Sequence, residues 1–163
     1  MENVYKKILL VTNDFGPRAG GIETFVIGLL ERIKGHEVTV FTSQQGDTSV
    51  YDQQWLDKFG VRVIRDQSKI LLPTWRVTRA AQKIVAAKNI DVVVFGAAAP
   101  LALMSPSLRK SGVKKIIALT HGHEVWWAKI FPFNFAIKRI GKNVDHLTYL
   151  GDFTRQAISK ALT

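Results

Sequence analysis

Three stretches of this chain consist almost entirely of apolar residues, and they limit the folds that it can adopt. They are "KILLVT" at residues 7–12, "DVVVFG" at 91–96 and "KIIALTHG" at 115–122. A strand with one face in water alternates apolar and polar residues, whereas these runs place apolar side chains on both faces. Such strands must be covered by helices on both sides. We therefore predict an α/β fold with a doubly wound parallel sheet.

The rest of the sequence continues this alternation of strand and helix. Further strands are predicted at residues 36–42, 61–66 and 144–151. Helical spacing of apolar residues predicts helices over 22–33, from Pro73 to about 88, over 97–110 with interruptions at Pro100 and Pro106, over 125–140 with a break at 131–133, and from about 153. There is no internal repeat, linker or low-complexity tract, so residues 1–163 are predicted to form one Rossmann-like domain.

The composition excludes several classes of protein. The chain has no cysteine, which rules out disulfides, thiolate metal sites and cysteine nucleophiles and suits a reducing compartment. Its N-terminus is polar and no apolar run is long enough to span a membrane, so we expect a soluble or peripheral protein. Lysine and arginine number 23 against 13 acidic residues, which gives a net charge of +10. This excess favours an anionic partner, whether nucleic acid, anionic lipid or a phosphorylated substrate.

A loop rich in glycine follows the first predicted strand and contains Gly16, Gly20 and Gly21. The first strand-to-helix turn of such a sheet is the usual phosphate site, because glycine lets the backbone approach a ligand and the helix N-terminus favours an anion. The spacing does not match the dinucleotide pattern G-x-G-x-x-G. It also fails as a P-loop, since Ile22 and Glu23 stand where lysine and a hydroxyl residue are required. Two explanations remain, a ligand approached by the bare backbone or simply a tight turn.

His121 directly follows a predicted strand and should lie at its carboxyl end, where ligands bind in such sheets. A single histidine in this place is often only structural. His121 and His123 are two residues apart and Glu124 follows, so two metal ligands are geometrically possible, but a third would have to come from elsewhere. Asp14 and Arg18 are predicted to face the same cleft, where a guanidinium suits an acceptor phosphate. The alternative for these two residues is a solvated loop charge.

Two basic and aromatic stretches are open to more than one interpretation. Arg76, Arg79 and Lys83 share one face of a predicted helix, and a later segment carries Trp126 and Trp127 among several cations. In the simpler interpretation the rings belong to the core and the cations to a solvated face. In the other, rings lie at the headgroup level of a membrane and cations contact anionic lipid. Nucleic-acid binding without catalysis is a rival function, although the sequence has no zinc-finger, RNP-like or clear helix-turn-helix motif.

Three segments taken together resemble a known family, namely "NDFGPRAGGIETF" at 13–25, "KGHEVTVFT" at 34–42 and "LTHGHE" at 119–124. In this order, on consecutive α/β units, they are similar to the N-terminal domain of retaining GT-B enzymes of glycosyltransferase family four. Within that family the likeness is to the phosphatidylinositol mannosyltransferases of actinobacteria, and it extends over essentially the whole chain. The resemblance implies that Gly20 and Gly21 let the backbone approach a nucleotide sugar, and that His121 hydrogen-bonds the transferred hexose.

The same resemblance implies GDP-mannose as donor substrate and a phosphoinositide-type lipid as acceptor, with Asp14, Arg18 and Glu124 as candidate acceptor contacts. It implies no metal and no other cofactor. A GT-B enzyme also needs a C-terminal domain that holds most of the donor site, and its motifs are absent from this sequence. The chain is therefore expected to be an acceptor-side half that is inactive alone and located in the cytoplasm, peripherally on the inner face of the plasma membrane.

Overall fold

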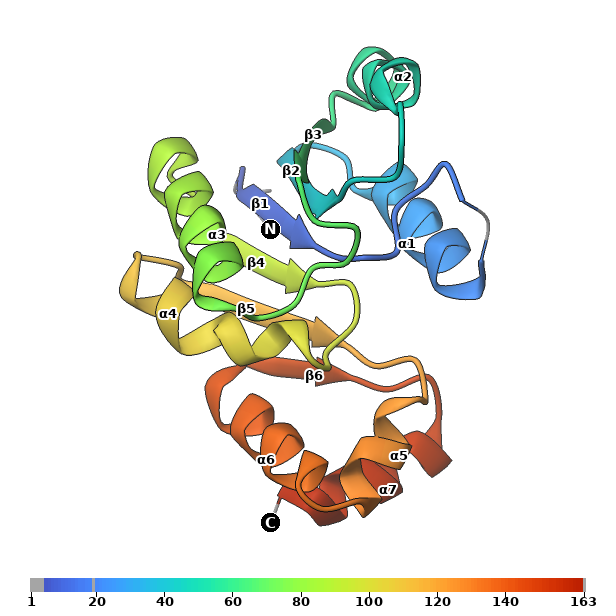
Figure 1. Ribbon diagram of the computed structural model, residues 1–163, viewed down its shortest axis with the longest axis vertical. Helices are drawn as coiled ribbons and strands as arrows, with labels where there is room; N and C mark the ends of the chain where they lie inside the picture. The colour runs from blue at the N-terminus through green and yellow to red at the C-terminus, as the bar shows by residue number, and fades with distance from the viewer. Residues whose placement is uncertain (1–4, 19, 163) are drawn as a thin grey trace.

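The computed structural model describes residues 5–18 and 20–162. Its elements follow one another as β1 (Lys7–Val11), α1 (Gly21–Arg32), β2 (Glu37–Ser43), α2 (Ser49–Phe59), β3 (Arg62–Asp66), α3 (Trp75–Lys88), β4 (Val92–Phe95), the 3-10 helix η1 (Leu101–Met104), α4 (Ser105–Lys110), β5 (Lys115–Leu119), α5 (Glu124–Lys129), α6 (Phe133–Asn143), β6 (His146–Thr148) and α7 (Asp152–Leu162). Within the described residues the sheet has six strands in the order β3-β2-β1-β4-β5-β6, and every neighbouring pair is parallel. This is the strand order of the doubly wound dinucleotide-binding fold, so the predicted fold class is confirmed (Figure 1).

Helices cover both faces of the sheet, as the apolar strands require. Along β1, Ile8 and Leu10 pack into the core shared with α1 and α2, while Leu9 and Val11 pack into the core shared with α3, α4 and α6. Successive side chains of a strand point to opposite faces, so this one apolar run supplies both cores. Figure 1 shows α1 and α2 on one side of the strands and α3 and α4 on the other. Helices α5, α6 and α7 pack against one another beside β6.

Local capping explains where α3 begins and where α2 and α3 end. The Thr74 hydroxyl accepts a hydrogen bond from the Val77 N–H at 3.3 Å and starts α3, directly after Pro73. Asn89 ends this helix in the left-handed conformation at φ 52°, which asparagine tolerates better than most residues. Gly60 ends α2 in the same way at φ 66°. These signals are local, so α3 ends where the sequence pattern predicts.

The structure departs from the sequence pattern in three elements. Helix α2 was not predicted, because its sequence is largely polar and only Trp55 is buried. The predicted helix over 97–110 is divided into η1 and α4, with Pro106 in the first turn of α4. The last strand was expected over residues 144–151, but β6 has only three residues, and their side chains are mostly exposed. An edge strand next to a single neighbour has less to bury than the central strands do.

The packing of β5 generates a stability prediction. Ile116 is fully buried among the residues that link the sheet to α3, α4 and α6. Replacing it in I116A should lower the free energy of unfolding by about 2–5 kcal/mol, because the lost side chain leaves a cavity. I70A removes the same side chain from a site that is 62% exposed and should change it by less than about 0.5 kcal/mol. Urea unfolding measures both, and equal losses would contradict the assignment of Ile116 to the core.

Candidate functional site

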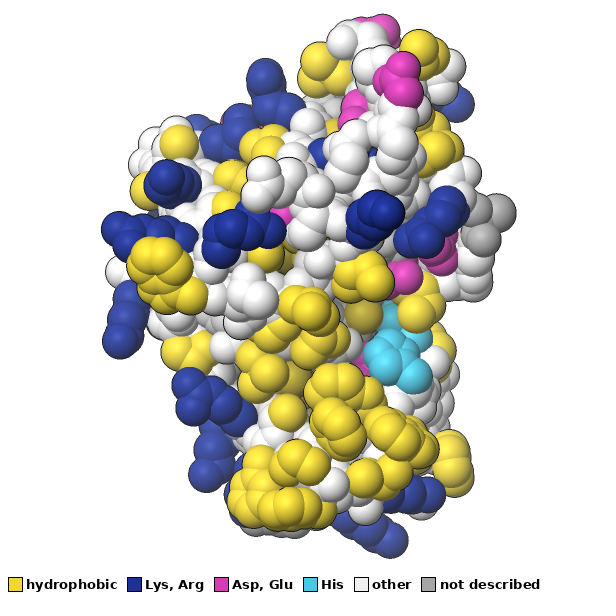
Figure 2. All heavy atoms as spheres, in the orientation of Figure 1, with side chains coloured by type: hydrophobic (Ala, Val, Ile, Leu, Met, Phe, Trp, Pro, Cys, Tyr) yellow, Lys and Arg dark blue, Asp and Glu magenta, His cyan; other side chains and the backbone are white. Residues whose placement is uncertain are grey.

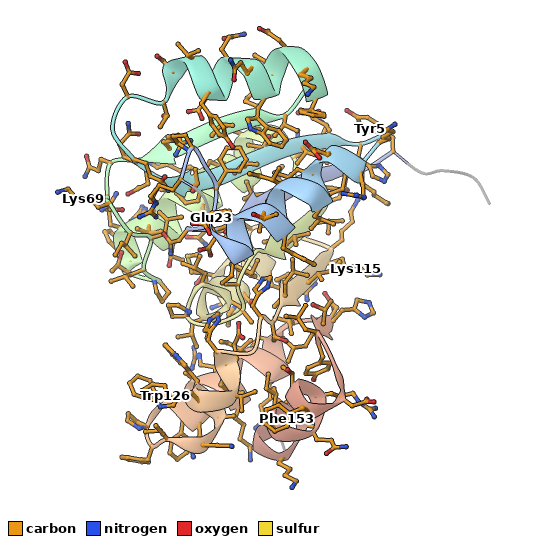
Figure 3. All side chains as sticks on the ribbon, turned by 90° about the vertical axis from the view of Figure 1, so that its right-hand side faces the viewer. Tyr5, Glu23, Lys69, Lys115, Trp126 and Phe153 are labelled. Carbon is orange, nitrogen blue, oxygen red and sulfur yellow. The ribbon has the colours of Figure 1, made fainter. Side chains whose placement is uncertain are left out.

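The carboxyl ends of β1, β4 and β5 meet at one edge of the sheet. β1 and β4 are neighbours, but the chain proceeds outward from them in opposite directions, to β2 and β3 on one side and to β5 and β6 on the other. Ligands of open α/β sheets bind in the crevice at such a reversal. In Figure 3 the strands run across the view, from the side of Tyr5 and Lys115 at their amino ends to the side of Lys69 at the carboxyl edge, and Glu23 at the start of α1 lies between them. The loops after these three strands therefore form the candidate site.

The loop that follows β1 is held in place by side chains from distant elements. The Asn13 amide pairs with the Leu71 backbone, donating from Nδ2 to the carbonyl at 2.9 Å and accepting from the N–H at 2.6 Å. Arg65 donates from Nη2 to the Gly16 carbonyl at 2.8 Å and forms an ion pair with Asp52 at 2.7 Å. Its side chain is only 6% exposed. The loop is thus fixed at both ends of residues 13–16 before any ligand binds.

The two adjacent glycines do not serve a tight turn. Gly20 is the N-cap of α1 with φ −167° and ψ 168°, an extended conformation that any residue adopts. A Cβ on Gly21 would meet no atom within 4 Å, and its φ lies outside the left-handed region. Neither the backbone conformation nor internal packing of the described residues requires glycine at position 21. At Gly21 the start of α1 therefore presents bare backbone to open space, which suits close approach by a ligand, whereas the Glu23 side chain lies over Gly20.

His121 lies directly across from this helix start. Its Nε2 is 2.6 Å from the Gly96 carbonyl oxygen, and its ring meets the Phe25 ring edge-on at 5.3 Å between centroids. A carbonyl oxygen can only accept, so Nε2 carries the hydrogen of this bond. In the neutral ring Nδ1 is then an acceptor, which can receive a hydrogen bond from a ligand hydroxyl. His121 is half-buried, so its position is well defined while the ring remains accessible.

Gly96, at the end of β4, is a site residue that the motif search missed. A Cβ on Gly96 would lie 2.6 Å from Thr12 Oγ1 and 2.7 Å from Thr12 Cβ. Only glycine fits there without moving Thr12, whose hydroxyl accepts the Asp14 N–H at 2.9 Å. Because Gly96 ends an apolar run with no glycine neighbour, its sequence gives no signal beyond the end of a strand.

Glu124 is placed differently from the candidate acceptor contact suggested by resemblance. Its side chain has no exposed surface, and Oε2 accepts the His121 backbone N–H at 3.0 Å. Oε1 lies 3.3 Å from His123 Nε2 but without the geometry of a hydrogen bond. A fully buried carboxylate cannot touch an acceptor, so Glu124 instead positions the histidine loop.

Asp14 and Arg18 do lie beside the histidines. Burial raises the pKa of the half-buried Asp14 carboxyl, and the negative charge of Glu23 raises it further. The nearby His121, His123 and Arg18 oppose this shift. These charges therefore lie within electrostatic range of one another at the mouth of the site, with Arg18 exposed to solvent. Among the described residues, no three or more His, Cys, Asp or Glu side chains are grouped closely enough to hold a metal ion.

The candidate surface residues are divided among several roles. Arg76 donates to both Asp66 carboxylate oxygens at 2.7 and 2.9 Å, and this hydrogen bonding holds the pKa of Asp66 far below its usual range. Arg79 stacks over the Trp75 ring at 4.8 Å, and Lys83 is exposed on the same helix.

Farther along, Trp126 is 56% exposed, whereas Trp127 packs on Phe133 and the core. None of the helices in the described part of the chain is long and apolar enough to cross a membrane.

The chain is similar to proteins of one known family. A family model described as Glycosyltransferase Family 4 matches residues 19–162. A Mycolicibacterium smegmatis protein named GDP-mannose-dependent alpha-(1-6)-phosphatidylinositol monomannoside mannosyltransferase is 37% identical over 94% of this chain. A Corynebacterium glutamicum protein named GDP-mannose-dependent monoacylated alpha-(1-6)-phosphatidylinositol monomannoside mannosyltransferase is 39% identical over 96% of it. The chain spans about 40% of the length of each of these relatives.

A solved structure with the same fold is Anabaena HepE in complex with UDP. It superposes with a TM-score of 0.65 at 12% identity, over 95% of this chain and 40% of the HepE chain. At such low identity the likeness concerns the fold alone. It agrees with the predicted doubly wound domain.

The fit of Gly96 against Thr12 can be tested by adding one methyl group. G96A should lower the free energy of unfolding by about 1–3 kcal/mol, because the new Cβ would clash with the Cβ and Oγ1 atoms of Thr12. G21A adds the same methyl group where no atom lies within 4 Å and should leave stability unchanged or slightly higher. Thermal or urea unfolding of both variants measures the difference. If G96A is as stable as the parent chain, Thr12 does not restrict position 96 to glycine.

Proposed function

The chain belongs to glycosyltransferase family 4, and on this premise we propose that it is the acceptor-side domain of a hexosyltransferase. The proposed reaction moves mannose from GDP-mannose to a phosphatidylinositol mannoside, as the names of its relatives describe for those proteins. The observation that carries the proposal is the position of His121, whose ring is hydrogen-bonded to the Gly96 carbonyl and packed on Phe25 in the first turns of α1. These groups lie at the topological reversal of the sheet, where a nucleotide sugar would be expected.

The donor is proposed to approach the start of α1. Its diphosphate would contact the backbone N–H groups at Gly20 and Gly21, where the helix dipole favours an anion. The transferred hexose would lie between this helix start and His121, with Nδ1 accepting from a sugar hydroxyl. His121 acts in this scheme by holding the sugar at the reacting centre, not as a general base. No resident metal or organic cofactor enters the proposal.

Acceptor recognition is assigned to the exposed rim of the same site. Arg18 can offer a planar guanidinium to the acceptor phosphate, and Asp14 can accept hydrogen bonds from acceptor hydroxyls. Glu124 contributes indirectly, through the backbone of His121. The whole cleft would need a second domain to exclude water, so the 163 residues alone are expected to transfer nothing.

A lipid acceptor would require a surface that can meet an anionic membrane. Figure 2 shows an apolar area over the lower half of this face, with lysine and arginine around it and histidine at its margin. Exposed Trp75 and Trp126, together with Arg79 and Lys83, are proposed to form this surface. Figure 3 shows Lys69 and Trp126 pointing to the same side of the molecule. Arg76 is a minor contributor because Asp66 binds its guanidinium.

The assignment of His121 is tested in a chimera in which this chain replaces the matching segment of the Mycolicibacterium smegmatis relative. The chimera should transfer mannose from GDP-mannose, and H121A should lower kcat by roughly a hundredfold or more, because a contact made in the transition state is lost. H146A is the matched control, since His146 is exposed and lies at the amino end of β6, paired with Ile117.

Three outcomes of this assay would contradict the proposal. An inactive but folded chimera would count against the proposed substrates. Near-normal turnover of H121A would show that the ring does not contact the sugar, and a drop accompanied by unfolding would leave only a structural role.

The membrane surface is tested with the 163-residue chain and vesicles. Binding should be strong to anionic vesicles at low salt, weaker at high salt, and weak to neutral vesicles. The double variant R79Q/K83Q should bind anionic vesicles about 30-fold less tightly, since each cation contributes about 1 kcal/mol near such a surface. K34Q/K58Q removes the same charge at the opposite, amino edge and should retain binding. Equal loss in both variants, or a preference for duplex DNA, would contradict the assignment.

A further inference from the structure

Glu23 places a carboxylate at the start of α1, three residues after the N-cap Gly20. The side chain folds back over the glycine, so that a Cβ on Gly20 would overlap Oε2 and would lie 2.9 Å from the Glu23 Cδ. Among the described residues no backbone N–H donates to this carboxylate, but it lies close enough to the helix start for the dipole to stabilise its negative charge. The structure thus already contains an anion at the entrance to α1, and it belongs to the protein itself.

This position is the one that the proposed function assigns to the donor diphosphate. Two anions cannot share one helix N-terminus without repulsion, which amounts to about 1 kcal/mol for two unit charges 4 Å apart even in bulk water. We infer that Glu23 is a specificity-determining residue whose carboxylate occupies the diphosphate position until a nucleotide sugar displaces it. The inference rests on the proposed function, because it takes the start of α1 as the donor site.

The electrostatics of the unliganded site support this role. The Glu23 charge reaches Asp14, whose pKa is raised first by burial and then by Glu23. His121, His123 and Arg18 supply the opposing positive potential around the same carboxyl group. Removing one carboxylate would therefore change the balance of charge at the mouth of the site. Glycine at position 20 is also consistent with this arrangement, since a larger residue would push the Glu23 carboxylate away.

The consequence is selection by the size of the ligand. A bare phosphate or pyrophosphate must displace Glu23 with the helix N–H groups alone, and gains little over the carboxylate already present. A nucleoside diphosphate sugar brings further contacts from its base, ribose and hexose, and these offset the displacement. Glu23 would therefore keep abundant small anions out of the site while admitting the donor.

The test compares two variants that lose the same charge. E23Q keeps a side chain that can still reach back to the helix start, so α1 should be preserved while the charge is removed. E31Q is the matched control, because Glu31 is exposed near the other end of the same helix. Binding of inorganic pyrophosphate and of GDP is measured by titration of the ¹⁵N-labelled chimera described above, which supplies the second domain, following the backbone amides of Gly20 and Gly21. Thermal unfolding of each variant is recorded alongside.

We expect E23Q to bind pyrophosphate at least about fivefold more tightly than the parent chimera and its E31Q variant, as the loss of about 1 kcal/mol of repulsion requires. E23Q should remain folded, with a slightly lower midpoint of thermal unfolding because the helix dipole no longer meets a negative charge. Equal or weaker pyrophosphate binding by E23Q, while GDP still shifts the Gly20 and Gly21 amides, would overturn the role of Glu23 and leave the donor site in place. If neither pyrophosphate nor GDP shifts these amides in any variant, the proposed donor site is wrong and the inference fails with it.

Discussion

The burial of the sheet on both faces is the constraint on which the rest of this structure depends. In β1, Leu9 and Val11 have no exposed surface and Leu10 has almost none, because helices cover the strand from both sides. Polar chemistry is therefore confined to the edge where the strands end. There the chain changes from Val11 to Thr12, Asn13 and Asp14 within three residues. The winding of the chain reverses between β1 and β4, and ligands of open α/β sheets bind at such a reversal.

The loops at this edge are held by contacts that do not involve a ligand. Arg65 shows how this is done, because its buried guanidinium donates to the carbonyls of Ser43 and Gly16 and to the carboxylate of Asp52. A buried charge is tolerated only when it is paired and hydrogen-bonded in this way. A loop fixed in advance loses less conformational entropy when a ligand binds. The same principle applies to His121, which is held by Gly96, Phe25 and the Glu124 carboxylate before a sugar arrives.

The net charge of the whole protein and the local charge at the candidate site have opposite effects on an anionic ligand. The net charge of +10 belongs to the protein as a whole and attracts anionic partners from a distance. At the candidate site, however, Asp14 and Glu23 oppose that field locally. The helical stripe of Arg76, Arg79 and Lys83 is divided in the same manner, since Arg76 is bound to Asp66 and Arg79 lies on the Trp75 ring. Counting cations along a helix overstates how many of them can meet a membrane.

The sequence by itself determined the class of fold, most of its helices and strands, and the position of His121 at the end of a strand. The fold class and the bounds of these elements depend on burial and capping, and both can be predicted from residues that are near one another in the sequence. It did not predict α2, since a mostly polar helix with one buried tryptophan has no clear period. Only the tertiary structure decided that the His121 ring meets the Gly96 carbonyl, that Asn13 pairs with Leu71, and that Glu124 lies inside. The first two partners lie 25 and 58 residues apart in sequence, and the order of the parallel strands brings them together. Local patterns carry no information on such distant pairs, because the strand order depends on the packing of the whole chain.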